Sequence, residues 1–345
     1  MSPNNYKCSN PQCAAHLRCE KNNSIMTIGL IDVDGHNFPN LALMKLSAYH
    51  KAKGDTVEWY HPFTRFDRVY KAKVFANTPD FGEYINANEV ISGGSGYAIH
   101  GAGGETYQKQ DDPSLSEDVE HIYPDYSLYN ITDTAYGYLT RGCPRGCTFC
   151  IVGKKEGLCS RKVADLSEFW GGQKNIVLYD PNILACRQWS DLLAQLADSK
   201  AMVDFNQGLD VRVLTPAKCR ALEHIRIKEI HFAWDRYEDK HKVLPKLEMF
   251  AELCNGKVGA HNAIVYVLVN HTSTIQQDLE RIYTLRDMGY WAYVMVYDKA
   301  HAPHVYTDLQ RWCNNRFVFA RCNRFEDYGK TEVKEDKRQL LLFNE

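Results

Sequence analysis

The stretch that decides the fold class is Tyr136–Cys150, which reads Tyr-Gly-Tyr-Leu-Thr-Arg-Gly-Cys-Pro-Arg-Gly-Cys-Thr-Phe-Cys. Its first five residues form a mostly apolar run that predicts a strand over Tyr136–Thr140. Cys143, Cys147 and Cys150 follow at once, in a C-x3-C-x2-C spacing. The carboxyl ends of the strands in a parallel βα series form the face on which active sites are built. We therefore expect the three thiols on that face.

Further apolar strands recur downstream, and helical stretches such as Trp189–Lys200 and Thr274–Met288 fill the gaps between them. This alternation is typical of a parallel βα series. Six units fit the chain, where a closed barrel needs eight. We expect a partial (β/α)6 TIM-like barrel over residues 135–300. Its later strands are predicted at Asn175–Tyr179, Met202–Phe205, Glu229–Ala233, Ala263–Val269 and Trp291–Val296.

A smaller α/β series precedes the barrel. Apolar runs predict four strands, and the apolar positions of Pro39–Lys53 fall on one face of a helix. This order indicates a small doubly wound domain over residues 25–100. A linker rich in Gly, Asp, Ser and Pro follows over 101–134, and residues 301–345 form a C-terminal extension that we expect to cover the open side of the barrel. The four strands are predicted at Met26–Val33, Thr56–Tyr60, Val69–Ala76 and Glu89–Ser92.

Composition narrows the class of protein. Of the 345 residues, 44% are hydrophobic and 24% charged, which are ordinary globular values. The formal net charge of -2 argues against a general nucleic-acid coat protein. No apolar run is long enough to span a membrane, and no secretory signal is visible, so we expect a cytoplasmic protein. In that compartment the 12 cysteines are expected as metal ligands or buried thiols.

Three thiolates on one loop suit a particular kind of metal centre. They can wrap a four-iron cluster but leave one iron open to a small molecule, whereas four cysteines would close it. A zinc site is the alternative, but zinc wants four ligands, and no second C-x2-C pair appears. Gly142 and Gly146 let the loop turn sharply, and Phe149 offers a flat apolar face beside the thiols.

The loop resembles the cluster motif of the radical S-adenosylmethionine (radical SAM) superfamily, including the aromatic Phe149 just before the third cysteine. The resemblance implies that Cys143, Cys147 and Cys150 bind a 4Fe-4S cluster whose open iron chelates SAM. Reductive cleavage would give methionine and a 5′-deoxyadenosyl radical, which abstracts hydrogen from a substrate. A reducing partner such as flavodoxin or ferredoxin is implied as well.

The same resemblance directs attention to polar residues at strand ends. Asp180 is the candidate for the amino group of SAM, and Phe149 lies beside the cofactor. Asn206, Gln207 and Arg212 are candidates for its ribose or carboxylate, and Asp235 is a weaker one. The strand Ala263–Val269 lacks the glycine-rich pattern found near the adenine in many members of the superfamily, so adenine contacts stay unassigned.

The N-terminal sheet resembles the cobalamin-binding-like fold that precedes the barrel in some radical SAM enzymes. Asp34 and His36 match part of the D-x-H-x-x-G loop of base-off cobalamin proteins, but Pro39 replaces its glycine. Gly93-Gly94 follows the last strand closer in sequence than that family's spacing. We therefore expect the fold without cobalamin; a cobalamin-dependent methyltransferase is the alternative.

The first 24 residues hold four soft ligands, Cys8, Cys13, His16 and Cys19. They could bind zinc or a second cluster, or form a tail with free thiols. A zinc knot here would favour another class of function, a non-catalytic module that contacts nucleic acid, against which the net charge counts. The substrate stays open among a peptide, a nucleic acid and a small metabolite, and no catalytic residue is assigned.

Overall fold

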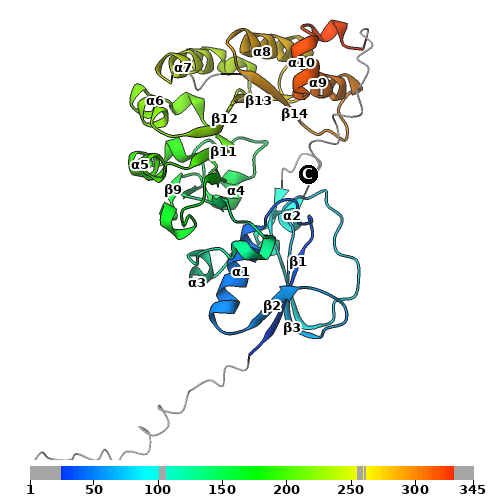
Figure 1. Ribbon diagram of the computed structural model, residues 1–345. Coiled ribbons are helices and arrows are strands. Elements are labelled where there is room, and N and C mark those ends of the chain that lie inside the picture. Colours follow the sequence, from blue (N-terminus) through cyan, green and yellow to red (C-terminus); the bar gives the residue numbers. More distant parts are fainter. Residues whose placement is uncertain (1–24, 101–105, 255–258, 260–261, 330–345) are drawn as a thin grey trace, which may run out of the picture.

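The computed structural model describes residues 25–100, 106–254, 259 and 262–329. They form a mixed α/β protein with two parallel sheets, one of four strands and one of six (Figure 1). The fold class is thereby confirmed at the level of two α/β units. The segment with Cys8, Cys13, His16 and Cys19 lies outside the described residues, so its metal site stays a prediction.

The small sheet has the strand order β2-β1-β3-β4, with all strands parallel. Its strands are β1 (Thr27–Asp32), β2 (Thr56–Trp59), β3 (Phe66–Ala72) and β4 (Ala87–Gly93). Helix α1 (Leu41–Ala52) connects β1 to β2 and buries Leu43 against the central strand. The order reverses beside β1, as in a doubly wound sheet. The connections from β2 to β3 and from β3 to β4 are fully described and contain no helix.

Strand β3 lies earlier than its predicted range, Val69–Ala76. It starts at Phe66, which is fully buried, and ends at Ala72. Beyond that point the amides of Val74 and Phe75 donate to the Asp34 carboxylate instead of a neighbouring strand. A side-chain acceptor thus ends the strand that the apolar pattern alone would continue.

The segment between the sheets packs against both of them. It contains the short elements α2 (Ser95–Ala98), β5 (Ile99–His100), β6 (Thr106–Tyr107) and α3 (Glu117–Glu120). Single helical turns also form at Lys109–Asp111 and at Tyr126–Tyr129. Asp125 accepts hydrogen bonds from Ser47 and Lys51 of α1, each at 2.6 Å. The Tyr126 hydroxyl donates to the Phe169 carbonyl at 2.6 Å. The described part of the expected linker is therefore a fixed connector.

The six strands of the large sheet keep chain order, β14-β13-β12-β11-β10-β7, and all are parallel. They are β7 (Thr134–Gly137), β10 (Asn175–Leu178), β11 (Met202–Leu209), β12 (Ile227–Ala233), β13 (Ala263–Val269) and β14 (Trp291–Val296). The helices α5 (Trp189–Ser199), α6 (Pro216–Glu223), α7 (Lys240–Leu253), α8 (Ile275–Asp287) and α9 (His304–Asn314) lie along the outer side of this sheet in Figure 1. All six predicted strands are confirmed to within a few residues.

The first of these strands ends sooner than predicted. It stops at Gly137, because the amides of Leu139 and Thr140 donate to the Asp180 carboxylate instead of a neighbouring strand. Leu139 is fully buried but lies off the sheet. The chain then enters β8 (Thr140–Arg141), which pairs antiparallel with β9 (Arg161–Lys162). The cysteine loop connects these two short strands and also contains α4 (Val152–Glu156).

The core lies between the large sheet and its helices. Alternate strand residues face them, as when Phe232 packs on Phe250 of α7 with ring centroids 5.0 Å apart. A buried Arg281 on α8 pairs with Asp278 at 2.5 Å and donates to the carbonyls of Trp234 and Leu268. Since both carbonyls lie at the carboxyl ends of strands, this guanidinium holds the rim of the sheet in place.

Helix α9 covers the free edge of the last strand, β14. Asn314 accepts from the amide of Val294 at 2.7 Å and donates to its carbonyl at 3.0 Å. Cys313 donates to the carbonyl of Ala292. Helix α10 (Arg316–Arg321) then packs against α9. Side chains of α9 therefore occupy backbone groups of Ala292 and Val294 that another strand would use at this edge.

Candidate functional site

The cysteine loop is closed at its base by hydrogen bonds. The amide of Cys143 donates to the carbonyl of Gly157 at 3.1 Å, and the amide of Gly142 donates to the Glu156 carboxylate at 2.9 Å. Gly142 has a φ of 85°, and a side chain there would collide with the carbonyl of Cys159. Only glycine fits both demands, so the loop needs Gly142 where the sequence has it.

Asp180 holds the chain just before this loop. It is 4% exposed, and its carboxylate accepts from the amides of Leu139 and Thr140 and from the Thr140 hydroxyl. Burial raises the pKa of Asp180 to about 6 although these bonds oppose the shift. The carboxylate thus ties the end of β10 to the strand that leads into the cysteines. Its predicted contact with the SAM amino group stays a prediction.

The three thiols are partly buried on this loop. The buried amide of Asn182, which follows β10, donates to the Cys143 sulfur at 3.4 Å. Burial raises the pKa of the Cys147 and Cys150 thiols above the ordinary value, and the negative charges of Asp235 and of the other cysteines add to the rise. The loop therefore brings the thiols within electrostatic reach of one another.

No three His, Cys, Asp or Glu side chains among the described residues are arranged to hold a single metal ion. The three cysteines are included in this statement. A single ion draws its ligands around one point. In a four-iron cluster each thiolate binds a different iron, so the sulfurs stay spread around the cube. The donor set is soft and lies on one loop, so its chemistry fits an iron–sulfur cluster, which stays a prediction.

A bulge at the carboxyl end of β11 carries Asn206 and Gln207. The pairing of β11 with β12 slips between Phe205 and Leu209, and Gly208 takes a φ of 90°. Gln207 is exposed, and Asn206 accepts a hydrogen bond at its carbonyl from the Tyr266 hydroxyl at 3.1 Å. Bulges of this kind redirect side chains next to active sites.

Charged residues from two strand ends reach the cysteine loop. Asp210 accepts from Arg212 at 2.8 Å and pairs with Arg145, which lies between the first two cysteines. The charges of Arg212 and Asp235 both act on Cys147. Burial raises the pKa of Asp235 to about 6, and its carboxylate makes no hydrogen bond to any residue that the structure describes.

Three rings lie together at the other end of the loop. Phe149 meets His271 edge-on with centroids 5.4 Å apart, and His271 meets Tyr297 at 4.7 Å. His271 follows β13, so the contact joins the first and fifth units of the series. Burial lowers the pKa of His271, and its Nδ1 is buried with no hydrogen-bond partner in the described ranges. The buried position therefore disfavours the charged form of the ring.

The face of the large sheet opposite the helices is aromatic and carries a carboxyl group. The His231 ring stacks on Tyr266 with centroids 5.1 Å apart. Oδ1 of Asp204 is buried, and within the described part of the chain it has no hydrogen-bond partner. Burial, with help from the nearby Glu229, raises the pKa of Asp204 to about 6. Tyr293 is 36% exposed, so this face is open to solvent beside β14.

In the small sheet, the corresponding loop after β1 is used internally. Asp34 accepts from the amides of Val74 and Phe75 and from the Thr78 hydroxyl. His36 stacks on Trp59, with ring centroids 4.1 Å apart. The predicted absence of cobalamin is not tested by these contacts.

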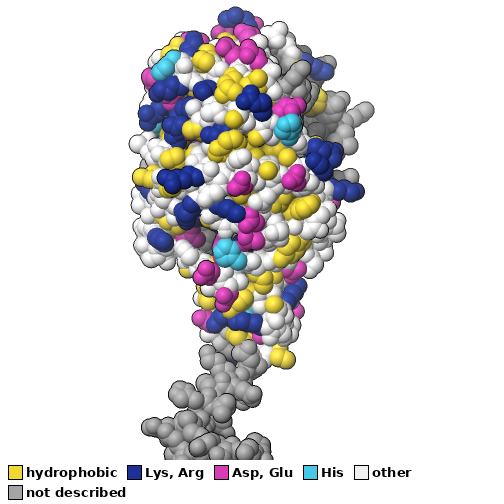
Figure 2. All heavy atoms as spheres, turned by 90° about the vertical axis from the view of Figure 1, so that its left-hand side faces the viewer, with side chains coloured by type: hydrophobic (Ala, Val, Ile, Leu, Met, Phe, Trp, Pro, Cys, Tyr) yellow, Lys and Arg dark blue, Asp and Glu magenta, His cyan; other side chains and the backbone are white. Residues whose placement is uncertain are grey.

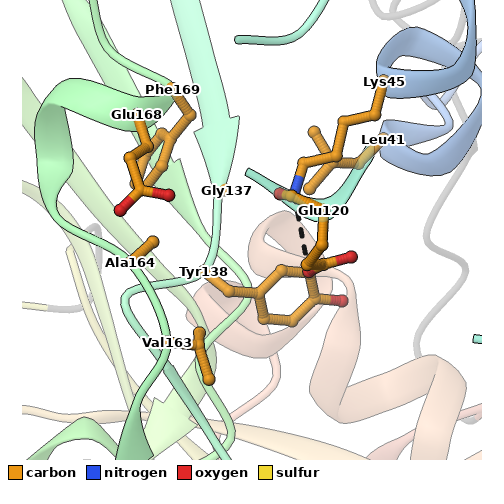
Figure 3. A pocket seen from close by; sticks show the side chains of 9 residues that line it. All are labelled: Leu41, Lys45, Glu120, Gly137, Tyr138, Val163, Ala164, Glu168 and Phe169. Carbon is orange, nitrogen blue, oxygen red and sulfur yellow. Dashed lines mark hydrogen bonds and ion pairs between the residues drawn. The ribbon is translucent and has the colours of Figure 1, made fainter. Parts of the chain in front are cut away.

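A small cavity lies between α1 and the end of β7 (Figure 3). Lys45 and Glu120 lie together on one side of it with a nitrogen–oxygen distance of 3.5 Å, and Gly137 and Phe169 lie on the opposite side. Its volume of about 10 Å³ is close to what one water molecule occupies. This cavity therefore belongs to the packing between the two sheets.

The structure brings Cys143, Cys147, Cys150, Phe149 and Arg212 to one rim, and it places Asn206 and Gln207 on the neighbouring bulge. Sequence reasoning missed four residues there, namely Arg145, Asp210, Arg236 and His271. Arg145 lies within the cysteine motif, and the other three lie within three residues of the end of a strand. Parallel sheets bind ligands at the carboxyl ends of their strands, so a search of the residues after every strand would have found them.

No family model and no curated protein matches this chain. Across the described ranges, none of the helices combines the length and the apolar character needed to cross a bilayer.

Proposed function

We propose that the chain is a radical SAM enzyme, in which Cys143, Cys147 and Cys150 hold a 4Fe-4S cluster and SAM binds the iron that no cysteine ligates. One observation carries the proposal. Three partly buried thiols stand on one pinned loop, directly after the first strand of a six-stranded parallel sheet. That loop lies at the carboxyl edge, where parallel α/β folds bind ligands.

The proposal includes a partial TIM-like barrel. Strands in chain order with their helices on one side follow the winding of a βα barrel. The side chains of α9 occupy the free edge of β14, so this strand does not pair with β7. A sheet that curls but stays open at this edge accounts for both observations.

When bound, the cluster supplies the electron that splits SAM into methionine and a 5′-deoxyadenosyl radical, which takes a hydrogen atom from the substrate. The residues around the loop suit the two charges of the methionine part of SAM. Arg212 would bind the SAM carboxylate. Asp235, whose carboxylate has no hydrogen bond to any described residue, would bind the SAM ammonium. Asp180, with three donors already bound, would act on SAM through the loop that it positions.

The aromatic contacts would protect the reaction from water. Phe149, His271 and Tyr297 form a cluster of rings beginning at the residue just before Cys150. A radical that reacts with unactivated carbon needs such exclusion of competing partners. We place the substrate on the helix-free face of the sheet, beside Asp204 and His231, whose polar atoms face away from the core.

The test is anaerobic purification, reconstitution with iron and sulfide, and incubation with SAM and dithionite. The proposal predicts about four irons per chain and formation of 5′-deoxyadenosine. Cys147→Ala should lose both. Cys219→Ala is the matched control, because Cys219 is fully buried in α6 and should leave both unchanged.

Zinc without iron, and no 5′-deoxyadenosine, would overturn the proposal in favour of a metal-binding module. About eight irons would add a cluster formed by Cys8, Cys13, His16 and Cys19. Cobalamin retained through purification would place the chain among the cobalamin-dependent methyltransferases.

A further inference from the structure

A second, larger pocket lies on the outer side of the cysteine loop. Its volume is about 550 Å³, which falls within the range of pockets that bind small molecules. It is lined by Cys147, by residues after β11 and β12, and by the first turns of α7. Figure 2 shows the face formed by the outer helices, on which Lys and Arg side chains are frequent in the upper half.

The lining of this pocket is strongly cationic. Five cationic side chains contribute to it, namely Arg145, Arg212, Arg236, Lys242 and Lys246, against one carboxylate, that of Asp239. The whole chain carries a formal net charge of -2, so this concentration of positive charge is local. A concave site with one sign of charge attracts ligands of the opposite sign.

Two carboxylates hold the guanidinium groups in place. Asp210, whose side chain is 6% exposed, binds both Arg145 and Arg212. Asp239 binds Arg212 at 3.2 Å and Lys242 at 3.1 Å. These ion pairs orient the cations without neutralising them all, since three of the cations share two carboxylates. The arrangement is therefore fixed before any ligand arrives.

Among these cations, Arg236 is the arginine whose side chain is left without a carboxylate partner in the described part of the chain. It is exposed, and its side chain has no ion pair or hydrogen bond with any residue that the structure describes. Its charge acts on both Cys147 and His271, so it stands between the pocket and the rings at the rim. A guanidinium offers five N–H donors in a planar fork that matches the oxygens of a phosphate.

We propose that this pocket binds the phosphate groups of a ligand of nucleotide size. A diphosphate would meet Arg236 and Lys242 directly, with Arg145 and Lys246 at either side. The inference requires only the cationic pocket and stands without the chemistry proposed for the cysteines. The same phosphate chemistry could come from a free nucleotide or from the backbone of an RNA strand, and the experiment separates these sources.

The experiment is calorimetric titration of the full chain with inorganic pyrophosphate, adenosine diphosphate, adenosine and a short single-stranded RNA, at low and high salt. We expect pyrophosphate and adenosine diphosphate to bind and adenosine not to bind, with affinity falling as salt rises. Binding of the diphosphate alone assigns a free nucleotide. Much tighter binding of the RNA, with a steeper salt dependence, assigns a nucleic-acid backbone.

Two variants test the residues. Arg236→Ala and Lys242→Ala should each weaken pyrophosphate binding by about tenfold, since each removes one charged hydrogen-bonding group. Lys174→Ala is the matched control. Lys174 is exposed just before β10, at the amino ends of the strands, whereas the pocket lies at their carboxyl ends. All three side chains are exposed, so the variants should unfold at the wild-type temperature.

Equal affinity in the Arg236 and Lys242 variants would overturn the proposal, as would failure of every phosphate compound to bind. SAM is titrated in the same way. If it binds more weakly to both variants while pyrophosphate does not bind at all, the proposal is overturned and the cations are assigned to the SAM carboxylate. Iron content and 5′-deoxyadenosine formation report on the cysteines, whereas pyrophosphate binding reports on Arg236 and Lys242, so the two proposals fail separately.

Discussion

The two parallel sheets each begin with a strand followed by a loop at the carboxyl edge, and the two loops use their polar groups differently. After β1, both carboxylate oxygens of Asp34 accept hydrogen bonds, from the amides of Val74 and Phe75 and from the Thr78 hydroxyl. After β7, the Cys147 thiol has no hydrogen-bond partner among the described residues, while Asp180 and Glu156 hold the chain around it.

The difference teaches that a place at the edge of a sheet does not by itself make a site. The loop after β1 uses its ionisable groups to fix its own fold. In the loop after β7, Asp180 and Glu156, which lie outside the cysteine motif, hold the backbone by hydrogen bonds. The thiols are therefore not needed to hold the loop and stay available to a ligand. His36 illustrates the first case, because its ring lies flat against Trp59.

The largest expected effect tests this difference between the loops by substituting one side chain in each. Cys143→Ala should abolish iron binding and 5′-deoxyadenosine formation, since each thiol anchors a different iron. His36→Ala should keep both near the wild-type level. Iron content and product formation, measured side by side, check the pair. An equal loss in the two variants would contradict the distinction between the loops.

A second prediction concerns Asp204, whose buried Oδ1 has no hydrogen-bond partner among the described residues. Its pKa is raised from 3.8 to about 6, so the folded protein holds its proton more tightly than the unfolded chain. Stability therefore falls as pH rises through this window, by about 3 kcal/mol at most. Asp204→Asn is neutral throughout and should gain on the wild type over the same range. Chemical unfolding at several pH values checks this; parallel curves would refute it.

The third prediction concerns the support of the cysteine loop. Asp180→Asn keeps the shape of the side chain but sets an NH2 group against backbone donors at Leu139 and Thr140. The asparagine oxygen can still accept on one side, and leaving the donor on the other side unsatisfied should lower the free energy of unfolding by about 1–3 kcal/mol. Thermal unfolding measures the loss, and slower SAM cleavage should accompany it. Unchanged stability would show that the loop does not depend on this carboxylate.

The smallest effect is expected in the small sheet. Asp34→Ala removes the acceptor for Val74, Phe75 and Thr78, in a partly solvated turn where water replaces the lost bonds. We expect a loss of about 1 kcal/mol in the free energy of unfolding, with SAM cleavage unchanged. A fall in cleavage larger than the fall in stability would mean that the small sheet takes part in the reaction.

Much of the fold could be predicted because strand periodicity is local. All six strands of the large sheet were placed from apolar runs. The misplaced boundaries at Val69–Ala76 and Tyr136–Thr140 have tertiary causes. The Asp34 carboxylate accepts hydrogen bonds from Val74 and Phe75, and the Asp180 carboxylate accepts them from Leu139 and Thr140. Neither contact is visible in the pattern of its own segment.

The candidate site divides in the same way. The spacing of Cys143, Cys147 and Cys150 is local and could be recognised at once. The pairing of Arg145 with Asp210 and the contact of Phe149 with His271 join residues far apart in the chain. Their positions follow from the order of the strands, which periodicity alone does not give. Asp180 was correctly placed at a strand end, but its partners could be known only from the fold.

The most direct test of the central claim is the electron paramagnetic resonance spectrum of the reduced, reconstituted protein, recorded before and after addition of SAM. The account predicts a signal typical of a reduced 4Fe-4S cluster, a change in its g values on addition of SAM, and no signal in Cys147→Ala. A spectrum that SAM leaves unchanged, or one that persists in Cys147→Ala, would contradict the claim that these three cysteines hold a cluster with one iron open to SAM.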